Sequence, residues 1–406
     1  MNSKFLSRFG YTGLGQAFYR FFSTHLGYMV FTSLHSTFMT TLLIRVTGDS
    51  AAAMKFNIIH YLVMGPAMAL SVYVTKKTSP VFTLRTGIAM YLMMYLTFFL
   101  TLEHLGQSMP LLAFFSGMGS GTYWYANNLG LGGYLEDANR DKGLGLMSMG
   151  EGVVSLTVPF LSGTIISRFE GLAGYLVVFG LGLAVATFTV LMSMTLAPLS
   201  GLGSRTHYRQ ALKISFCNKS FFLMMSANLI KGLRAGPMGC FMNLILYETV
   251  KSEFAVGLST LLSGLVAIAG AALYGRIVRE KNRFRSMLIS TTVLMAGALA
   301  LLHPTPVVII LFSMLNGFCG CFLQNPTMSI YFSAIQQPEY QEMQGEFHGI
   351  KEMFMTVGRV AGILFAMFGS SLLSPAVVVL LLTVTQYLMI AMQMPVKRAL
   401  EQRKHS

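Results

Sequence analysis

Two basic residues lie within a stretch of sequence that is otherwise long and apolar enough to cross a lipid bilayer. Residues 221–247 read FFLMMSANLIKGLRAGPMGCFMNLILY, with Lys231 and Arg234 near the middle. A spanning helix needs about 20 apolar residues, and a Lys or Arg at its centre costs roughly 2.5–3.5 kcal/mol. The two cations are three residues apart, so they share a helix face, with Asn228 one turn earlier. We expect this face to line a cavity, where the cations would attract a carboxylate or a phosphate.

Ionisable residues in two other apolar stretches point to proton coupling or to a buried ion pair. Glu151 lies about a third of the way into the run 144–166, and Arg359 lies in the run 350–373. A buried carboxylate must be paired or protonated. Glu151 could carry a coupling proton, pair with a buried cation such as Arg359, or stay hydrated near a helix end. Glu352, two turns before Arg359 on the same helix face, is a rival partner for that arginine.

Polar and aromatic side chains in further apolar runs could bind an organic substrate by stacking and hydrogen bonding. The candidates are His35, Trp124, Asn127, Gln324 and Asn325. Because consecutive helix residues fan around the axis, only part of the Tyr123-Trp124-Tyr125 segment can face one cavity. The alternative for each is packing between helices, and for His35 a hydrogen-bonded packing role competes with proton relay.

The composition excludes a soluble enzyme. The 406 residues are 54% hydrophobic and only 11% charged, whereas soluble domains carry about 25% charged residues. The sequence has no phosphate-binding loop for ATP hydrolysis, and its four cysteines show no metal-ligand spacing. We therefore predict no enzymatic activity, no catalytic residues, no cofactor and no metal site, in a multi-pass protein of the lipid bilayer.

Twelve apolar runs predict an all-α membrane protein with twelve transmembrane helices. The runs are 21–44, 54–74, 82–102, 111–134, 144–166, 175–197, 221–247, 255–274, 286–303, 307–335, 350–373 and 377–395. The longest interior link, 198–220, divides the chain into an N-terminal bundle over 1–197 and a C-terminal bundle over 221–406. Each bundle then contains six helices, and the basic link between them is expected in the cytoplasm.

The distribution of basic residues predicts the orientation in the membrane. An even number of spans places both termini on one side. Of the 29 lysines and arginines, 22 fall on that side, four on the other, and three inside spans. Cytoplasmic loops carry the excess of Lys and Arg, so both termini are expected in the cytoplasm. This asymmetry also explains the net charge of +14 without invoking a nucleic acid.

The two halves align on each other at an offset of 200 or 201 residues. Phe21-Phe22 falls on Phe221-Phe222, Tyr73 on Tyr274, Arg85 on Arg285, and Ser116-Gly117 on Asn316-Gly317. Parallel six-helix repeats related by an axis along the membrane normal build one large class of transporters. With twelve spans, this repeat and basic links after the second and eighth spans (SVYVTKKTSP and YGRIVREKNRFR), the chain resembles the major facilitator superfamily over essentially its whole length.

This resemblance implies a secondary active transporter of the inner (plasma) membrane that works by alternating access as a monomer. The stretch GEGVVSLTVPFLSG in the fifth span partly matches the exporter branch of that family. We expect efflux by antiport with protons of a small organic molecule that bears an anionic group. An importer or exchanger of an organic anion, and a non-transporting receptor or assembly factor that keeps the fold, remain as alternatives.

Overall fold

The computed structural model describes residues 14–134, 140–199, 206–278, 282–335 and 337–405. Within these residues the chain is helical and contains no β-strand. The first half contains α2 (Gln16–Thr47), α3 (Ser50–Lys77), α4 (Pro80–Leu100), η1 (Leu102–His104), α5 (Leu105–Tyr134), α6 (Arg140–Ser167) and α7 (Ala173–Ser193). The second half contains α8 (Tyr208–Cys217), α9 (Lys219–Val250), α10 (Glu253–Ile277), α11 (Arg283–Ala300), α12 (Pro306–Ile335), η4 (Pro338–Met343), α13 (Gln344–Leu372) and α14 (Pro375–His405).

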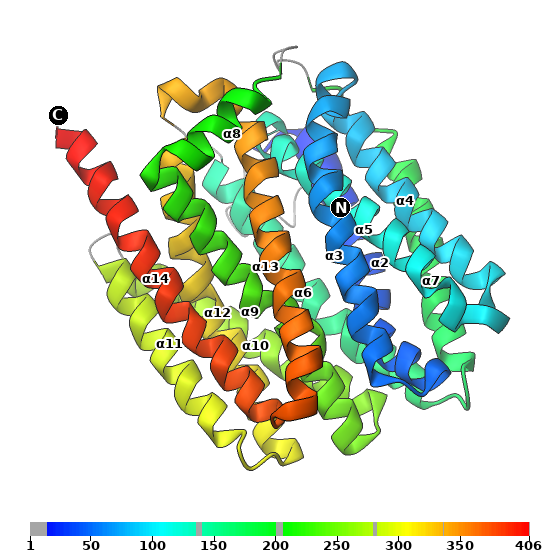
Figure 1. Cartoon of the computed structure of the whole chain (residues 1–406). Coiled ribbons are helices and arrows are strands. Elements are labelled where there is room, and N and C mark those ends of the chain that lie inside the picture. Colours follow the sequence, from blue (N-terminus) through cyan, green and yellow to red (C-terminus); the bar gives the residue numbers. More distant parts are fainter. Residues whose placement is uncertain (1–13, 135–139, 200–205, 279–281, 336, 406) are drawn as a thin grey trace.

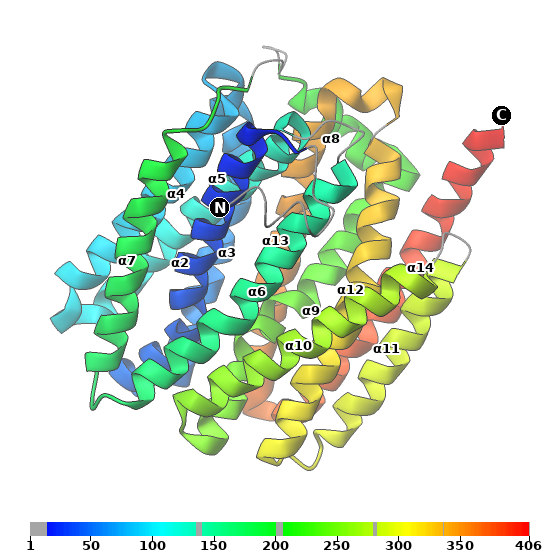
Figure 2. The same cartoon turned by 180° about the vertical axis from the view of Figure 1, so that it is seen from behind.

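The long helices confirm the predicted fold class. Leaving out the short α8, the described α-helices match the twelve predicted spans in order. Nine of them are long and apolar enough to cross a membrane by length and composition. The first six long helices form one bundle and the last six a second bundle, which lie side by side in Figures 1 and 2. The short helix α8 lies in the predicted link 198–220, of which residues 200–205 fall outside the described part of the chain.

Polar residues at the chain turns define where several of these helices begin. Asp49, Ser79, Asn218 and Ser252 stand immediately before α3, α4, α9 and α10, and each side chain accepts a hydrogen bond from a backbone N–H of the first turn. Such caps satisfy donors that a helix leaves unpaired. Gly48 ends α2 with a φ of 68°, a left-handed conformation that suits glycine. The α2–α3 turn is therefore short because its residues can both end one helix and start the next.

Equivalent glycines support the internal repeat. A methyl group added at Gly117 of α5 would overlap the carbonyl oxygen of His60 in α3. One added at Gly317 of α12 would collide with the carbonyl oxygen of Ser263 in α10. In both halves, the fourth long helix thus packs its glycine directly on the backbone of the second, as close helix packing in membranes favours.

The helices α9 and α13 pack most extensively among the described helices. Gly232 and Gly236 of α9 lie against the backbone of α13, and Gly358 and Gly362 of α13 lie against the backbone of α9. An added methyl group at any of the four would overlap a backbone carbonyl oxygen of the opposite helix. This reciprocal crossing, with small residues four apart on both helices, holds the two backbones in direct contact.

Two helix pairs join the bundles to each other: α3 packs along α13, and α6 packs along α10.

Ion pairs between the bundles lie at both ends of the molecule. At the end that contains α8, here called the linker end, Lys76 Nζ lies 2.6 Å from Glu346 Oε1. The exposed fractions of these side chains are 8% and 0%. The backbone N–H of His207 donates to the same oxygen at 3.0 Å, so the link between the bundles also contacts this ion pair.

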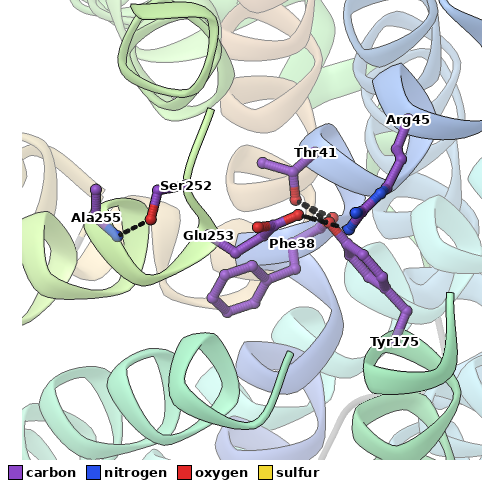
Figure 3. A network of polar contacts seen from close by, with 7 residues as sticks. All are labelled: Phe38, Thr41, Arg45, Tyr175, Ser252, Glu253 and Ala255. Atoms are coloured by element: carbon purple, nitrogen blue, oxygen red, sulfur yellow. Dashed lines mark hydrogen bonds and ion pairs between the residues drawn. The ribbon is translucent and has the colours of Figure 1, made fainter. Parts of the chain in front are cut away.

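At the opposite end, Glu253 of α10 contacts two helices of the first bundle (Figure 3). Arg45 Nη1 of α2 lies 3.0 Å from Glu253 Oε1, and the Tyr175 hydroxyl of α7 donates to that oxygen at 3.0 Å. The Arg45 side chain is 39% exposed, so this contact is far more hydrated than the ion pair at the linker end.

The short helix α8 is fastened to the first bundle by Tyr208. Its hydroxyl donates to the carbonyl oxygen of Ala69 at 2.8 Å, and its ring stacks on Tyr73 with centroids 5.1 Å apart. Burial raises the pKa of the Tyr208 hydroxyl above its ordinary value, which keeps this donor protonated.

Candidate functional site

A polar cavity of about 360 Å³ lies between the helices of the first bundle and α9. Helices α2, α3, α4 and α5 supply most of its wall, and Asn243 is contributed by α9. Among the described lining residues none carries a formal charge, and the wall combines imidazole, hydroxyl, amide and aromatic groups. A cavity of this size and chemistry suits a small organic molecule that makes both stacking contacts and hydrogen bonds.

Hydrogen bonds hold several of these lining groups in place. His60 Nδ1 lies 2.9 Å from Ser116 Oγ, which joins α3 to α5. The hydroxyls of Tyr91 and Ser120 are 2.6 Å apart, which joins α4 to α5. His35 Nδ1 lies 3.2 Å from the carbonyl oxygen of Phe31 one turn earlier. These groups are therefore pre-oriented toward a bound molecule, which lowers the entropic cost of binding.

A cluster of charged residues adjoins the cavity through Tyr61. This tyrosine lines the cavity, and the Arg359 guanidinium lies 4.9 Å from the centre of its ring. Arg359 also forms an ion pair with Glu352 on the preceding turns of α13. The predicted rival partner is therefore the one that contacts Arg359, and the contact with Tyr61 extends across the boundary between the bundles.

Two lysines give this cluster an excess of positive charge. Lys231 of α9 interacts electrostatically with Lys351, Arg359 and Glu352. The Lys351 side chain is buried and its ammonium lies 5.3 Å from the centre of the Tyr331 ring. In the described part of the chain neither lysine forms an ion pair, so one carboxylate stands against three cations. A buried group with this imbalance favours a bound anion.

The side chains of Arg234 and Lys231 have different neighbours. Its Nη2 donates to Asn316 Oδ1 of α12 at 2.6 Å, and its Nε has no hydrogen-bond partner within the described ranges. The side chain is buried. Arg234 therefore contacts α12, whereas the charges that act on Lys231 belong to α13, although the two residues share one side of α9.

Glu151 contacts His25, not a cation of the second bundle. Its Oε1 lies 2.8 Å from His25 Nε2, while His25 Nδ1 lies 3.0 Å from the hydroxyl of Tyr123. The Glu151 side chain is 36% exposed and the His25 side chain is fully buried. Glu151 and Arg359 thus have different partners, on different helices.

The remaining predicted residues are spread over several environments. His35 and Trp124 line the cavity. Asn127 and Asn228 are buried, and their side-chain oxygens have no hydrogen-bond partner among the residues described. Gln324 and Asn325 are exposed on α12 and lie outside the described cavity wall. Within the described residues, no group of three or more His, Cys, Asp or Glu side chains is placed to hold a metal ion.

Sequence reasoning overlooked three residues of this region. His60 lies in a predicted span, so the expectation that ionisable residues inside spans are functional applies to it as it does to Lys231. Lys351 is the second residue of the predicted run 350–373, a position typical of a hydrated helix border, yet the structure buries it. His25 meets Glu151, 126 residues away in the chain, and nothing in the sequence indicates that contact.

Comparisons with known proteins agree with this architecture. Residues 5–363 match the sequence profile of the Major Facilitator Superfamily. An uncharacterized protein of Bacillus subtilis (strain 168), YqgE, is 24% identical over 339 residues, covering 83% of this chain and 79% of that protein. A Geobacillus stearothermophilus protein, described as an uncharacterized protein in the sodM 3' region, is 27% identical over 159 residues, covering 39% of this chain and 73% of its own length.

Solved transporter structures share the fold at low sequence identity. The nucleoside transporter NupG superposes with a TM-score of 0.70 at 14% identity, covering 94% of this chain and 99% of NupG. A bacterial homologue of the human lysosomal transporter Spinster, in an inward-facing and unoccupied conformation, gives 0.66 at 12% identity, covering 95% and 97%. The profile match spans most of the sequence, and the chain belongs to the Major Facilitator Superfamily.

Proposed function

We propose that this transporter exports a small organic molecule with an anionic group in exchange for protons. The observation that carries the proposal is the excess of buried positive charge next to a neutral polar cavity. The cavity would hold the organic part of the substrate, while Lys231 and Arg359 would attract its carboxylate or phosphate. Coulomb attraction is strong in such a poorly solvated site.

The proposed orientation places the linker end in the cytoplasm of a bacterial-type inner or plasma membrane, with both termini on that side. The excess of Lys and Arg in the links at that end supports it. The exporter direction rests on the stretch 150–163 of α6. Gly163 of this stretch packs against the backbone of Glu253 and Gly257 of α10, so the matching segment lies at the contact between the bundles. We propose that the protein works as a monomer.

Glu151 is the proposed carrier of the coupling proton. It is partly exposed and hydrogen-bonded to a histidine, so it can exchange a proton with water without leaving a charge unpaired. Glu151→Gln should abolish transport driven by a pH gradient and spare substrate counterflow in proteoliposomes. A variant that still responds to the gradient would exclude this role. It would then favour an importer or exchanger of an organic anion that uses no proton at Glu151.

The anion site is tested by comparing two lysine variants in proteoliposomes. Lys231→Met should reduce transport of organic acids by at least tenfold while leaving the protein folded, because it removes charge next to Arg359. Lys55→Met is the matched control, since Lys55 is exposed, pairs with Asp49 at 3.4 Å and lies outside the cavity wall. Equal transport by both variants would refute the anion site. Arg234→Ala, tested alone, reports whether the second cation also acts on the substrate.

The uncharged cavity wall favours one other substrate class, a neutral polar ring compound. The similarity to a nucleoside transporter extends to the fold alone, but His35, His60 and Trp124 could stack on or hydrogen-bond such a ring. A thermal-shift panel of organic acids, phosphorylated sugars and nucleosides separates the two classes. Stabilisation by neutral compounds that persists in Lys231→Met would favour the neutral class over the anion.

A non-transporting receptor that keeps the fold is the remaining alternative. In such a protein, the buried charged side chains would be expected to form ion pairs with one another. Arg359 and Glu352 do so, but Lys231 and Lys351 form no ion pair with any described residue. The unbalanced charge therefore favours transport. Absence of both uptake and efflux for every compound that stabilises the protein would favour the receptor.

A further inference from the structure

His25 connects a partly exposed carboxylate to a tyrosine beside the cavity. Its Nε2 lies 2.8 Å from Glu151 Oε1, and its Nδ1 lies 3.0 Å from the Tyr123 hydroxyl. The imidazole therefore uses both ring nitrogens at once. Because each nitrogen can donate or accept, the direction of one hydrogen bond constrains the direction of the other.

The groups that face His25 are few. They are Glu151 of α6, Tyr123 and Trp124 of α5, and Tyr28 of α2. Arg20, one turn earlier on α2, donates instead to the carbonyl oxygen of Thr195 at 3.1 Å. From α7, the neutral Thr189 packs on Gly27. Among these described neighbours, the carboxylate of Glu151 is the one charged group in contact with the imidazole.

We infer that a proton taken up by the His25–Glu151 pair reverses the hydrogen bond between His25 and Tyr123. Without the extra proton, His25 Nε2–H donates to the Glu151 carboxylate, and Nδ1 accepts from the Tyr123 hydroxyl. If the added proton binds at Nδ1, the imidazolium donates at both nitrogens. The Tyr123 oxygen then becomes the acceptor, and the tyrosine hydrogen turns away from the imidazole.

The reversal does not depend on which partner holds the extra proton. If Glu151 is protonated, its hydroxyl donates to Nε2, and the neutral imidazole carries its own hydrogen at Nδ1. In this case too, Nδ1–H donates to the Tyr123 oxygen. One proton added to the pair therefore has a single structural consequence, which appears at Tyr123.

Tyr123 passes this change to the wall of the substrate cavity. Its ring stacks face to face on Tyr28, with centroids 3.4 Å apart and an interplanar angle of 3°. Both Tyr28 and the adjacent Trp124 line the cavity. The hydroxyl of Tyr123 thus lies within a packed aromatic group whose other members face the substrate. The link to transport rests on the proposed function, whereas the protonation step itself needs no substrate.

Trp124 makes the protonation step measurable. It is the only tryptophan in the sequence, and its ring centroid lies 5.9 Å from that of His25. A protonated imidazole quenches indole fluorescence at contact distance, so the emission of the purified protein should show one step as the pH is lowered and the pair takes up its proton. The step should disappear in His25→Gln. Glu151→Gln should also alter the step, because the carboxylate that shares the proton with His25 is gone.

His35→Gln is the matched control, because His35 is also buried in α2 and lines the same cavity. It should keep the step. An unchanged step in His25→Gln, a wild-type protein without a step, or a step that His35→Gln removes would each overturn the inference. If His25→Gln does not fold, Glu151→Gln carries the same test, since an unchanged step in that variant contradicts the pairing.

Tyr123→Phe separates the inference from the proposed function. This variant should keep the fluorescence step, because His25 and Glu151 remain, but its transport should lose its dependence on pH. Transport that keeps the wild-type pH profile would refute the role of Tyr123. If neither wild type nor variant transports any compound while the step persists, the proposed function fails and the protonation of His25 stands.

Discussion

Breaking the ion pair between Lys76 and Glu346 should open the linker end of the molecule. The two side chains belong to different bundles, are almost completely buried and lie 2.6 Å apart. Removing one partner of a buried pair costs about 3–5 kcal/mol, because the remaining charge stays buried after losing its counterion. Glu346→Gln still offers an oxygen to the N–H of His207, so we expect the lower end of that range, about 3 kcal/mol.

A change of about 3 kcal/mol alters the equilibrium between closed and open linker ends by roughly 100-fold. Spin labels at Lys77 and Glu342, which are exposed on opposite bundles at this end, would report the change as a longer distance distribution. The labels need a background in which the four native cysteines are replaced. Glu346→Gln should move most of the population to the longer distance in detergent and in nanodiscs.

Two further variants show whether charge pairing is the cause. The double variant Lys76→Met with Glu346→Gln leaves no unpaired buried charge and should lie closer to wild type than Glu346→Gln alone. Arg45→Gln breaks the hydrated ion pair at the opposite end. It should shift the population toward molecules with a closed linker end, by less than tenfold, because exposed ion pairs contribute little. Additive effects in the double variant, or a wild-type distance distribution in Glu346→Gln, would refute the reasoning.

Two other predictions concern packing and the second buried arginine. Gly358→Ala should destabilise the protein by about 1–3 kcal/mol, since the new methyl group would overlap a backbone carbonyl of α9. Gly320→Ala in α12, where no atom lies within 4 Å of an added methyl group, is the control, and equal melting temperatures would contradict the overlap. Asn316→Leu should destabilise the fold by about 2 kcal/mol by removing the partner of Arg234, as measured by thermal unfolding. An unchanged unfolding temperature would show that Arg234 has another compensating contact.

Hydropathy was sufficient to predict the long helices, and the long basic link 198–220 together with the repeat predicted their division into two halves. An apolar run of twenty residues has few alternatives to a membrane span, so element type and order follow directly. The short α8 was not predicted, because ten residues of mixed polarity carry a weaker signal. The aligned residues Ser116 and Asn316 each form a hydrogen bond with a side chain of another helix, that of His60 and that of Arg234.

The partners of the ionisable residues could not be predicted from the sequence. Only the Arg359–Glu352 pair could be predicted, because both residues lie on one face of one helix. Glu151 meets His25, and Arg234 meets Asn316, across different helices. Those contacts depend on the rotation and crossing of helices, which glycines such as Gly232 and Gly358 determine through backbone contact. An excess of apolar residues on every face gives no periodic signal for that rotation.

The glycine crossing of α9 and α13 has a consequence for how a bound anion would leave. Lys231 stands next to Gly232, and Arg359 next to Gly358, so both cations are attached to backbones that touch. If the proposed anion site is correct, the backbones that carry these cations would keep their spacing during transport, and moving the two helices apart would not be the means of weakening the site. Release would then depend on water, which would screen the attraction when the cavity becomes hydrated. The dielectric of the cavity, more than the position of its side chains, would set the affinity on each side of the membrane.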